Sequence, residues 1–449
     1  MDPRSLTASR AGFLGLSGYH WLVVAAGWAG WGFDVFDALL FNFVAPNCIP
    51  ALLRLAPGSH AAHEAVVFWT GTITSILLVS WAAGGVLFGW IADRIGRKRA
   101  LFATIALYAA GTGLCALTTS LWQLILFRTI AGLGIGGEWG TGAALVAEGV
   151  PENRRIEAGV IMQTASPLGL VLATAVNYQI AGVWFAEQPD TSWRFVFLAG
   201  LLPALVAVGV RLLLRDSTSW QKSRAQGAPS TPRELFAPAL RAATLSGFFV
   251  AAVAIVSWWG CNAFIPLLGS TLAHEHARSL DLAAPAAQQL ATVWQAHTSN
   301  AFNLGGLVGA FAAVPLARSL GRRPMFVAYF LFSAAAMLVT FGAGFTPGMR
   351  VAMLFTVGAG VYGIFGAFTF YLPELFPARL RATGAGFCYN IGRLLAAGGP
   401  YIVGVLSAMA GGSSAAILRI LFWFALVPLS AALIARFVIV ETRGRALPA

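Results

Sequence analysis

The sequence predicts an all-α membrane protein with twelve transmembrane helices, and three observations lead to this fold class. Of its 449 residues 58% are hydrophobic and only 10% are charged, whereas a soluble domain carries about 25% charged residues. Apolar runs of about 20 residues recur along the whole chain, and each can cross a hydrocarbon core about 30 Å thick. The chain also contains 50 glycines, and glycine is more frequent in transmembrane helices than in soluble ones.

The apolar runs define twelve spans, with boundaries good to about four residues. The spans cover residues 20–46, 66–92, 99–118, 121–149, 156–184, 193–215, 242–268, 293–317, 325–345, 350–375, 383–408 and 414–437. A polar, basic and proline-containing segment separates spans six and seven and reads as a linker. We therefore expect an N-terminal six-helix half at 1–215, a cytoplasmic linker at 216–240 and a C-terminal six-helix half at 241–449.

The distribution of positive charge predicts the orientation. Most of the 29 lysines and arginines fall on the side shared by both termini and the linker, which the positive-inside rule assigns to the cytoplasm. Orientation thus explains the net charge of +12 without a nucleic-acid partner. The first apolar run is longer than a signal-peptide core and contains two acids, so we expect an uncleaved span. Arginine supplies nearly all the basic residues, which hints at a bacterial genome and an inner-membrane location.

Two landmarks occur twice in the chain. The stretch GWIADRIGRKRA (89–100) joins spans two and three, and VPLARSLGRRPM (314–325) joins spans eight and nine, with Gly96 and Gly321 at equivalent places. EGVPENRR (148–155) and ELFPARLR (374–381) end spans four and ten at nearly the same offset. Two landmarks at one offset indicate two homologous halves in parallel orientation. Transporters built this way hold their substrate near the membrane midplane, between the repeats.

The loop that begins at Gly89 resembles the signature loop of the major facilitator superfamily. The stretches FRTIAGLGIGGEWG in span four and GFCYNIGRLLAAGGP in span eleven resemble most the sialate:proton and aromatic-acid:proton symporter families within it. The resemblance covers the whole chain. It implies that span two packs against span eleven and that spans one and four lie side by side at a central cavity.

The resemblance also implies a set of gating contacts on the cytoplasmic side. Small Gly89 would allow close helix approach, and Asp93 would face the N-terminus of span eleven, where a carboxylate is favoured. Glu148 would pair with Arg97 or Arg155, and Glu374 with Arg322 or its neighbour Arg323. The alternatives are a basic turn that only fixes topology and helix-end charges that face lipid headgroups. The full set of expected gating residues is Gly89, Asp93, Arg94, Arg97, Glu148, Arg155, Arg322, Glu374 and Arg381.

Span four contains the run Gly132-x-Gly134-x-Gly136-Gly137. It superficially resembles a dinucleotide-binding loop, but no strand precedes it and no βαβ unit surrounds it. Gly132 and Gly136 are four residues apart and predict a small-residue face for close helix packing.

Buried acids in spans one and four are the candidates for proton coupling. Arg128 and Asp37 both lie on the order of 10 Å inside the outer membrane edge at the helix rise, so we expect them to pair. Asp34 lies one turn below Asp37 on the same face and is the better candidate for the proton, and Glu138 is a third acid in span four. The alternative is that the acids are static. Trp31 replaces the first acid of the related families' motif, which weakens an aromatic-acid assignment.

Span eleven supplies the candidate substrate site. Arg393 lies near the midplane, and a cation there favours a bidentate contact with a carboxylate; the alternative is a pair with the acids of spans one and four. Indoles and an amide in span seven would line an apolar pocket or only pack. The candidate substrate-binding residues are Arg393, Asn390, Tyr389, Arg128, Trp258, Trp259 and Asn262.

These observations predict a secondary active transporter that takes up a small organic anion together with protons, such as a monocarboxylate, a sugar acid or a sialic-acid-like solute. The alternatives are a proton-driven antiporter that exports a drug or metabolite and a sensor that binds solute without moving it. Nothing in the sequence indicates an enzyme, a cofactor, a metal site or a nucleic-acid partner. We expect a monomer in the lipid bilayer, with both termini in the cytoplasm.

Overall fold

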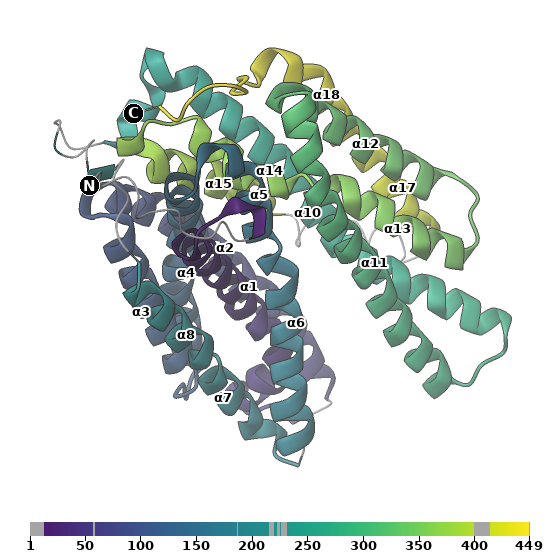
Figure 1. The fold of residues 1–449 in the computed structure, drawn as a ribbon. Helices are drawn as coiled ribbons and strands as arrows, with labels where there is room; N and C mark the ends of the chain where they lie inside the picture. The colour runs from purple at the N-terminus through teal and green to yellow at the C-terminus, as the bar shows by residue number, and fades with distance from the viewer. Residues whose placement is uncertain are drawn as a thin grey trace. The chain divides into compact units, whose positions relative to one another are not determined.

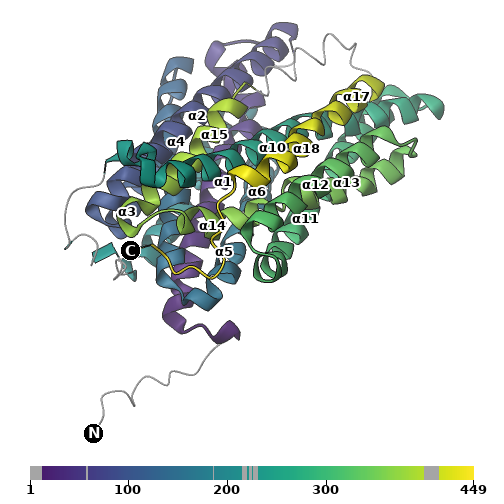
Figure 2. The ribbon, with the colours of Figure 1, turned by 90° about the horizontal axis from the view of Figure 1, so that it is seen from above.

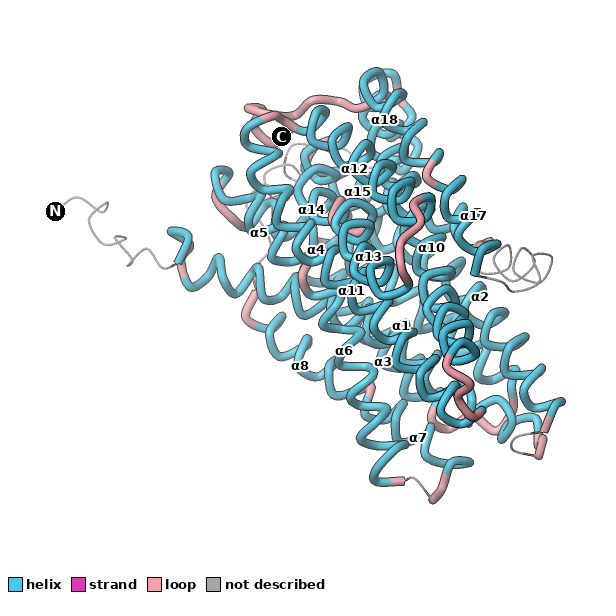
Figure 3. The backbone as a smooth tube through the Cα atoms, turned by 90° about the vertical axis from the view of Figure 1, so that its right-hand side faces the viewer, coloured by secondary structure: helices cyan, strands magenta, loops and turns pink. Residues whose placement is uncertain are grey.

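The structure is a computed structural model that describes residues 13–56, 59–185, 187–214, 220–221, 225, 231–398 and 414–448. These residues form helices and turns, and the described ranges contain no strand (Figure 3). The N-terminal twelve residues, 12 of the 25 residues of the expected linker and the end of expected span eleven at 399–408 lie outside the described residues.

The chain divides into two compact units. Unit 1 comprises residues 1–240, 369–390 and 446–449, and unit 2 comprises residues 241–368 and 391–445. This division follows the packing of the chain, whereas the predicted halves follow the sequence repeat, and the halves stay a prediction.

Unit 1 contains the purple-to-teal helices of Figure 1. They are α1 (Gly18–Leu53), α2 (His60–Ile95), α3 (Arg97–Cys115), α4 (Leu121–Gly149), α5 (Arg155–Gln163), α6 (Ala165–Asn177), the π-helical turn η4 (Tyr178–Trp184), α7 (Pro189–Ala199) and α8 (Leu201–Leu212). The short 3-10 helices η3 (Glu152–Arg154), η5 (Pro232–Phe236) and η6 (Ala378–Leu380) follow in the connections. The second part of α14 (Phe365–Glu374) and the first part of α15 (Arg381–Ala396) also belong to unit 1.

Unit 2 contains most helices of the second part of the chain. They are α10 (Pro238–Ser279), α11 (Ala284–Ser319), α12 (Arg322–Gly342), α13 (Pro347–Val361), α17 (Ser414–Phe424) and α18 (Leu426–Val438), together with the first residues of α14 and the end of α15.

The helices account for the twelve expected spans of the fold. Within the described residues nine helical segments are long and apolar enough to cross a membrane. The other three spans correspond to α3, α4 and α15, which carry buried charged residues such as Arg97, Arg128 and Arg381. The all-α twelve-helix prediction is confirmed.

Glycines bring the helices of each unit close together, and they do so at equivalent positions. A Cβ on Gly132 would lie 2.1 Å from the Ser80 hydroxyl of α2, so the predicted small-residue face of α4 does pack closely. Gly134 on α4 contacts Tyr108 on α3, and Gly360 on α13 contacts Ser333 on α12. Ser333 follows Tyr108, and Gly360 follows Gly134, at the offset of the sequence repeat. The same close contacts thus recur in the two units.

The two loop glycines of the repeat share an unusual backbone conformation. Gly96 has φ +103° and Gly321 has φ +96°, a region that side chains with a Cβ rarely adopt. Each glycine turns the chain directly into a helix that begins with an arginine, α3 at Arg97 and α12 at Arg322.

Candidate functional site

A buried ion pair joins α1 and α4 inside unit 1. Arg128 Nη1 lies 3.4 Å from Asp37 Oδ2, and both side chains are almost fully buried. Arg128 Nη2 also donates to the backbone carbonyls of Asp37 (3.1 Å) and Ala38 (3.3 Å). The Thr112 hydroxyl of α3 donates to the other carboxylate oxygen, Oδ1, at 2.6 Å. Charge-assisted bonds of this kind hold a carboxylate and a guanidinium in one geometry, and the expected pairing of Asp37 with Arg128 is present.

Two further acids are buried in the same helices. Asp34 is fully buried, one turn before Asp37 on α1. Glu138 on α4 is 2% exposed and accepts a hydrogen bond of 2.9 Å from Thr104 on α3. Thr104 and Thr112 lie eight residues apart on α3, so one helix supplies a hydroxyl to an acid of α4 and to an acid of α1. The sequence reasoning singled out the three acids but missed both threonines, which look like ordinary polar residues of a span.

An aromatic cluster lies next to these acids. Tyr389 of α15 stacks on Trp139 of α4, with ring centroids 3.8 Å apart and planes inclined by 15°. Trp31 of α1 contacts both rings edge-on, at 6.5 Å from Trp139 and 6.3 Å from Tyr389. Trp81 of α2 contacts Trp31 at 6.4 Å. Because Trp31 precedes Asp34 by three residues, the two side chains share a face of α1.

Close backbone packing holds this part of α15 against α2 and α4, which lie beside it in Figure 2. A Cβ on Gly140 would lie 2.9 Å from Cα of Gly386, and a Cβ on Gly85 would lie 1.9 Å from the Asn390 amide nitrogen. Asn390 is fully buried and donates from that amide to the Gly386 carbonyl at 2.9 Å. Of the residues expected to bind substrate, Tyr389 and Asn390 are therefore both buried, among helices of unit 1.

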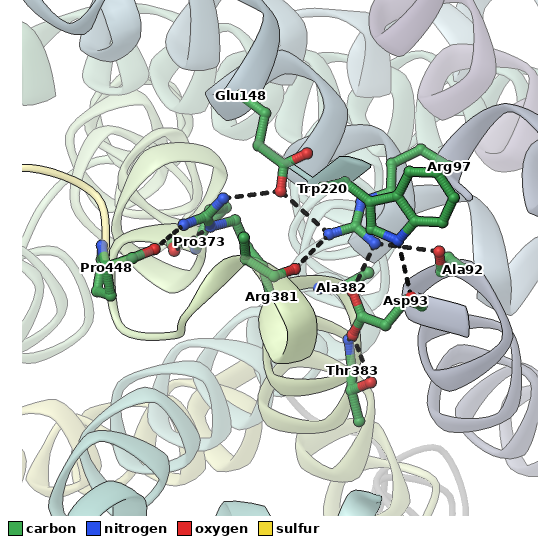
Figure 4. Close-up of polar contacts among 11 residues, drawn as sticks. Ala92, Asp93, Arg97, Glu148, Trp220, Pro373, Arg381, Ala382, Thr383 and Pro448 are labelled. Carbon is green, nitrogen blue, oxygen red and sulfur yellow. Dashed lines mark hydrogen bonds and ion pairs between the residues drawn. The ribbon is translucent and has the colours of Figure 1, made fainter. Parts of the chain in front are cut away.

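A network of four buried charges lies where α2 and α4 end and α3 and α15 begin, at helix ends that the sequence predicts to face the cytoplasm (Figure 4). Arg97 contacts Asp93 at 2.6 Å and Glu148 at 3.0 Å, and Glu148 also contacts Arg381 at 2.7 Å. All four side chains in these contacts are 0% exposed. Two acids and two arginines balance, which is what burial of charges requires.

Asp93 also caps α15. It accepts from the backbone N–H of Ala382 (3.3 Å) and Thr383 (2.7 Å) and from the Thr383 hydroxyl (2.5 Å). A Cβ on Gly89 would lie 2.7 Å from the Ala382 carbonyl oxygen, so α2 and α15 approach closely here. The expected contact between Asp93 and the N-terminus of span eleven is present, and so is the close approach at Gly89.

Two segments that the sequence reasoning did not connect to this network also bind it. The indole N–H of Trp220, in the expected linker, donates to the Asp93 carbonyl at 2.8 Å, and Arg381 donates to the Pro448 carbonyl near the C-terminus at 2.7 Å (Figure 4). Further along the linker, Glu234 of η5 pairs with Arg379. A lone tryptophan in a polar linker was the only sequence signal for this docking.

Other expected gating residues take different partners. Arg155 lies 4.0 Å from Glu374, so Glu148 pairs with Arg97 and Arg381 rather than with Arg155. The guanidinium of Arg94, which is exposed, stacks 4.3 Å above the Trp90 ring. An ion pair of Glu374 with Arg322 or Arg323 would join the two units and stays a prediction.

In unit 2 the backbone N–H groups of Arg322 and Arg323 donate to Glu441 at 2.9 and 3.0 Å. Partial burial alone would raise the pKa of the Glu441 carboxyl. Hydrogen bonds from the backbone of Arg322, Arg323 and Arg443 outweigh it and hold that pKa below its ordinary value. Glu441 therefore caps the N-terminus of α12, a role that sequence reasoning missed.

The expected substrate residues of unit 2 have aromatic surroundings. Trp258 contacts Trp259 at 5.1 Å, Tyr362 at 5.7 Å and Phe365 at 6.3 Å. Trp258, Trp259 and Asn262 are half-buried, and Arg393 on α15 is 5% exposed. The described residues contain no group of three or more His, Cys, Asp or Glu side chains that could hold a metal ion.

A helical membrane fold with a repeated loop motif, buried charges in its spans and an ion network at its helix ends is typical of a membrane transporter. The chain belongs to the Major Facilitator Superfamily, whose profile matches residues 35–400. It is a multi-pass transporter and not an enzyme.

Relatives with curated names include transporters of organic acids. The chain is 31% identical, over 94% of its length and 90% of the relative, to a probable 4-methylmuconolactone transporter of Cupriavidus pinatubonensis. It is 25% identical to the gentisate transporter of Corynebacterium glutamicum, over 88% and 83% of the two chains. It is 24% identical to the sialic acid transporter NanX of Escherichia coli, over 86% of each chain, and 24% identical to the niacin transporter NiaP of Acinetobacter baylyi, over 98% of each chain. The predicted likeness to the sialate and aromatic-acid families is confirmed.

Solved structures share the fold. The proton:xylose symporter XylE superposes with a TM-score of 0.67 at 18% identity, covering 96% of this chain and 98% of XylE.

Proposed function

We propose that this chain is a proton-coupled symporter that takes up a small organic anion across a bacterial inner membrane. The observation that carries the proposal is the buried contact of Asp37 with Arg128, beside Asp34 on the same helix face. Ionisable residues inside a membrane span are rare and mark ion or substrate pathways. The relatives named as transporters of gentisate and sialic acid support an organic acid as the solute.

Proton coupling follows from the charge balance of the pair. With Asp37 ionised, its carboxylate neutralises Arg128 and accepts from Thr112. Protonation of Asp37 or Asp34 removes one negative charge and weakens the hold on Arg128, because an unbalanced buried charge is costly. The guanidinium then favours a new anion, and the carboxylate of the solute supplies it. Binding of solute and binding of a proton thereby support each other.

The solute would be held from α15. Arg393 and Tyr389 lie four residues apart on this helix and so share a face, with Asn390 beside them. A guanidinium offers a carboxylate two parallel hydrogen bonds, and the aromatic rings supply apolar contact. In unit 2 the pair Trp258 and Trp259, with Asn262, offers a second half-buried surface for the solute.

The ion network at the cytoplasmic ends would act as the gate. Four buried charges and the Asp93 cap hold α2, α4 and the start of α15 together. Such contacts stabilise the state that is closed to the cytoplasm and must break when the solute is released there. The excess of arginine on the side of both termini supports cytoplasmic termini, and we expect the monomer to be the working unit.

Uptake into proteoliposomes tests the proposal. Labelled gentisate, niacin and sialic acid are offered with and without an inward proton gradient, and we expect one of them to accumulate only with the gradient. The same protein carrying Asp34→Asn and Asp37→Asn should lose accumulation, and Arg393→Gln should lose affinity. Accumulation that ignores the gradient would reject symport, and export driven by the gradient would favour the antiporter.

A further inference from the structure

The aromatic cluster of unit 1 contains a hydrogen-bond donor that has no partner in the part of the chain the structure describes. Trp139 is 0% exposed, and its indole N–H makes no hydrogen bond there. By contrast, Trp28 donates to the Thr164 hydroxyl at 3.0 Å and Trp193 donates to the Asp190 carbonyl at 2.7 Å. A buried donor that is left unmet is destabilising and calls for an explanation.

Aromatic contacts fix the orientation of the Trp139 side chain. The stack with Tyr389 and the edge contacts with Trp31 fix the plane of the indole ring. Trp31 in turn shares a face of α1 with Asp34, the candidate proton carrier. The backbones of Gly140 and Gly386 are in close contact. This contact holds α4 and α15 together at the stack.

We propose that the indole N–H of Trp139 donates a hydrogen bond to a carboxylate oxygen of the transported anion, so that Trp139 is a substrate-contacting residue. This inference rests on the proposed function, because it takes the solute to be an organic anion. It adds to the expected arginine site a neutral donor on α4, held by Tyr389. A neutral donor is suited to an anion that must also leave, because it binds without adding a second buried charge.

Trp139→Phe tests the proposal, because phenylalanine keeps an aromatic ring against Tyr389 and lacks the N–H donor, although its ring is smaller than the indole. A hydrogen bond to a charged group corresponds to a loss of about 10- to 100-fold in affinity. We expect KM for gentisate, niacin or sialic acid to rise by about that factor, with the maximal rate within about twofold. Because the smaller ring leaves part of this buried site empty, the thermal midpoint without solute should fall, so KM is the measurement that decides the test.

Trp193→Phe is the matched control. It also removes a buried indole N–H, but one that donates to the Asp190 carbonyl. We expect its KM to stay unchanged and its thermal midpoint to fall. Should Trp139→Phe fail to fold, benzothienylalanine at position 139 keeps the bicyclic shape and lacks the N–H, and the same rise in KM is expected.

The outcomes separate the two claims. A wild-type protein that accumulates none of the three acids rejects the proposed function, and this inference with it. A wild-type protein that accumulates one of them, with a variant KM within about twofold of wild type, overturns the role of Trp139 alone. An unchanged KM with a lowered thermal midpoint assigns Trp139 to packing and also overturns it.

Discussion

Replacing Glu148 by glutamine is the sharpest perturbation of the ion network. Glu148 lies 3.0 Å from Arg97 and 2.7 Å from Arg381, and its side chain is 0% exposed in both contacts. Glutamine has nearly the same shape but no charge, and one of its two polar termini is a donor that faces guanidinium groups. The substitution therefore leaves two buried arginines against one remaining acid, Asp93.

The magnitude follows from the burial of the pair. Removing one partner of a buried ion pair costs about 3–5 kcal/mol. In the state open to the cytoplasm water reaches these groups, so nearly all of this cost falls on the closed state. A shift of about 3 kcal/mol changes the equilibrium between the two states by about 100-fold. We expect Glu148→Gln to convert a largely closed population into a largely open one.

Pulsed electron paramagnetic resonance measures this shift. Spin labels at Arg99 and Ser319, both exposed and both at helix ends expected to face the cytoplasm, should report one distance distribution for the closed state and a longer one for the open state. Glu152→Gln is the control, because Glu152 follows Glu148 by four residues, in η3, and is exposed. A Glu148→Gln distribution that matches wild type would refute the reasoning that this network holds the cytoplasmic side closed.

Three more predictions follow from named contacts. Asp37→Asn should reduce gradient-driven uptake by about 10-fold or more and lower the thermal midpoint. The double variant Asp37→Asn with Arg128→Gln should recover the thermal midpoint but not the uptake. Full uptake in either variant would contradict the role of Asp37. Gly89→Ala should cost about 1–3 kcal/mol of stability in thermal unfolding, because its Cβ would lie 2.7 Å from the Ala382 carbonyl oxygen. The control is Gly209→Ala, whose Cβ would meet nothing within 4 Å and which should be neutral in the same measurement. Glu441→Gln should lower the thermal midpoint at neutral pH. Because folding lowers the pKa of Glu441, the contribution of its carboxylate to stability is complete above the ordinary carboxyl pKa and is lost as the pH falls through the folded pKa. A difference in thermal midpoint between variant and wild type that is equal at every pH would contradict the capping role.

The fold was predictable because a membrane imposes simple rules on sequence. Span length and the positive-inside bias depend on residue type alone, and the repeat is visible in Gly96 and Gly321 without any structure. The ion pair of Asp37 with Arg128 was expected from their matching depths, counted along the two spans, together with the family resemblance, which implies that spans one and four lie side by side.

The parts that could not be predicted depend on contacts between distant segments. Nothing in the local sequence distinguishes Thr112, which bonds Asp37, from other threonines in the spans. Glu148 pairs with Arg97, as expected. It also pairs with Arg381, which lies 233 residues further along the chain and could not be identified as its partner by counting residues. The sequence analysis did not single out Trp139, because its stacking on Tyr389 depends on how α4 meets α15.

Gradient dependence of uptake tests the central claim most directly. Proteoliposomes that contain the wild-type chain are loaded at neutral pH and diluted into acidic buffer with labelled gentisate, niacin or sialic acid, and a protonophore is added to half of them. The proposed symport predicts accumulation of one of these acids above its external concentration, abolished by the protonophore and by Asp34→Asn with Asp37→Asn. Accumulation that survives both treatments, or efflux driven by the same gradient, would contradict it.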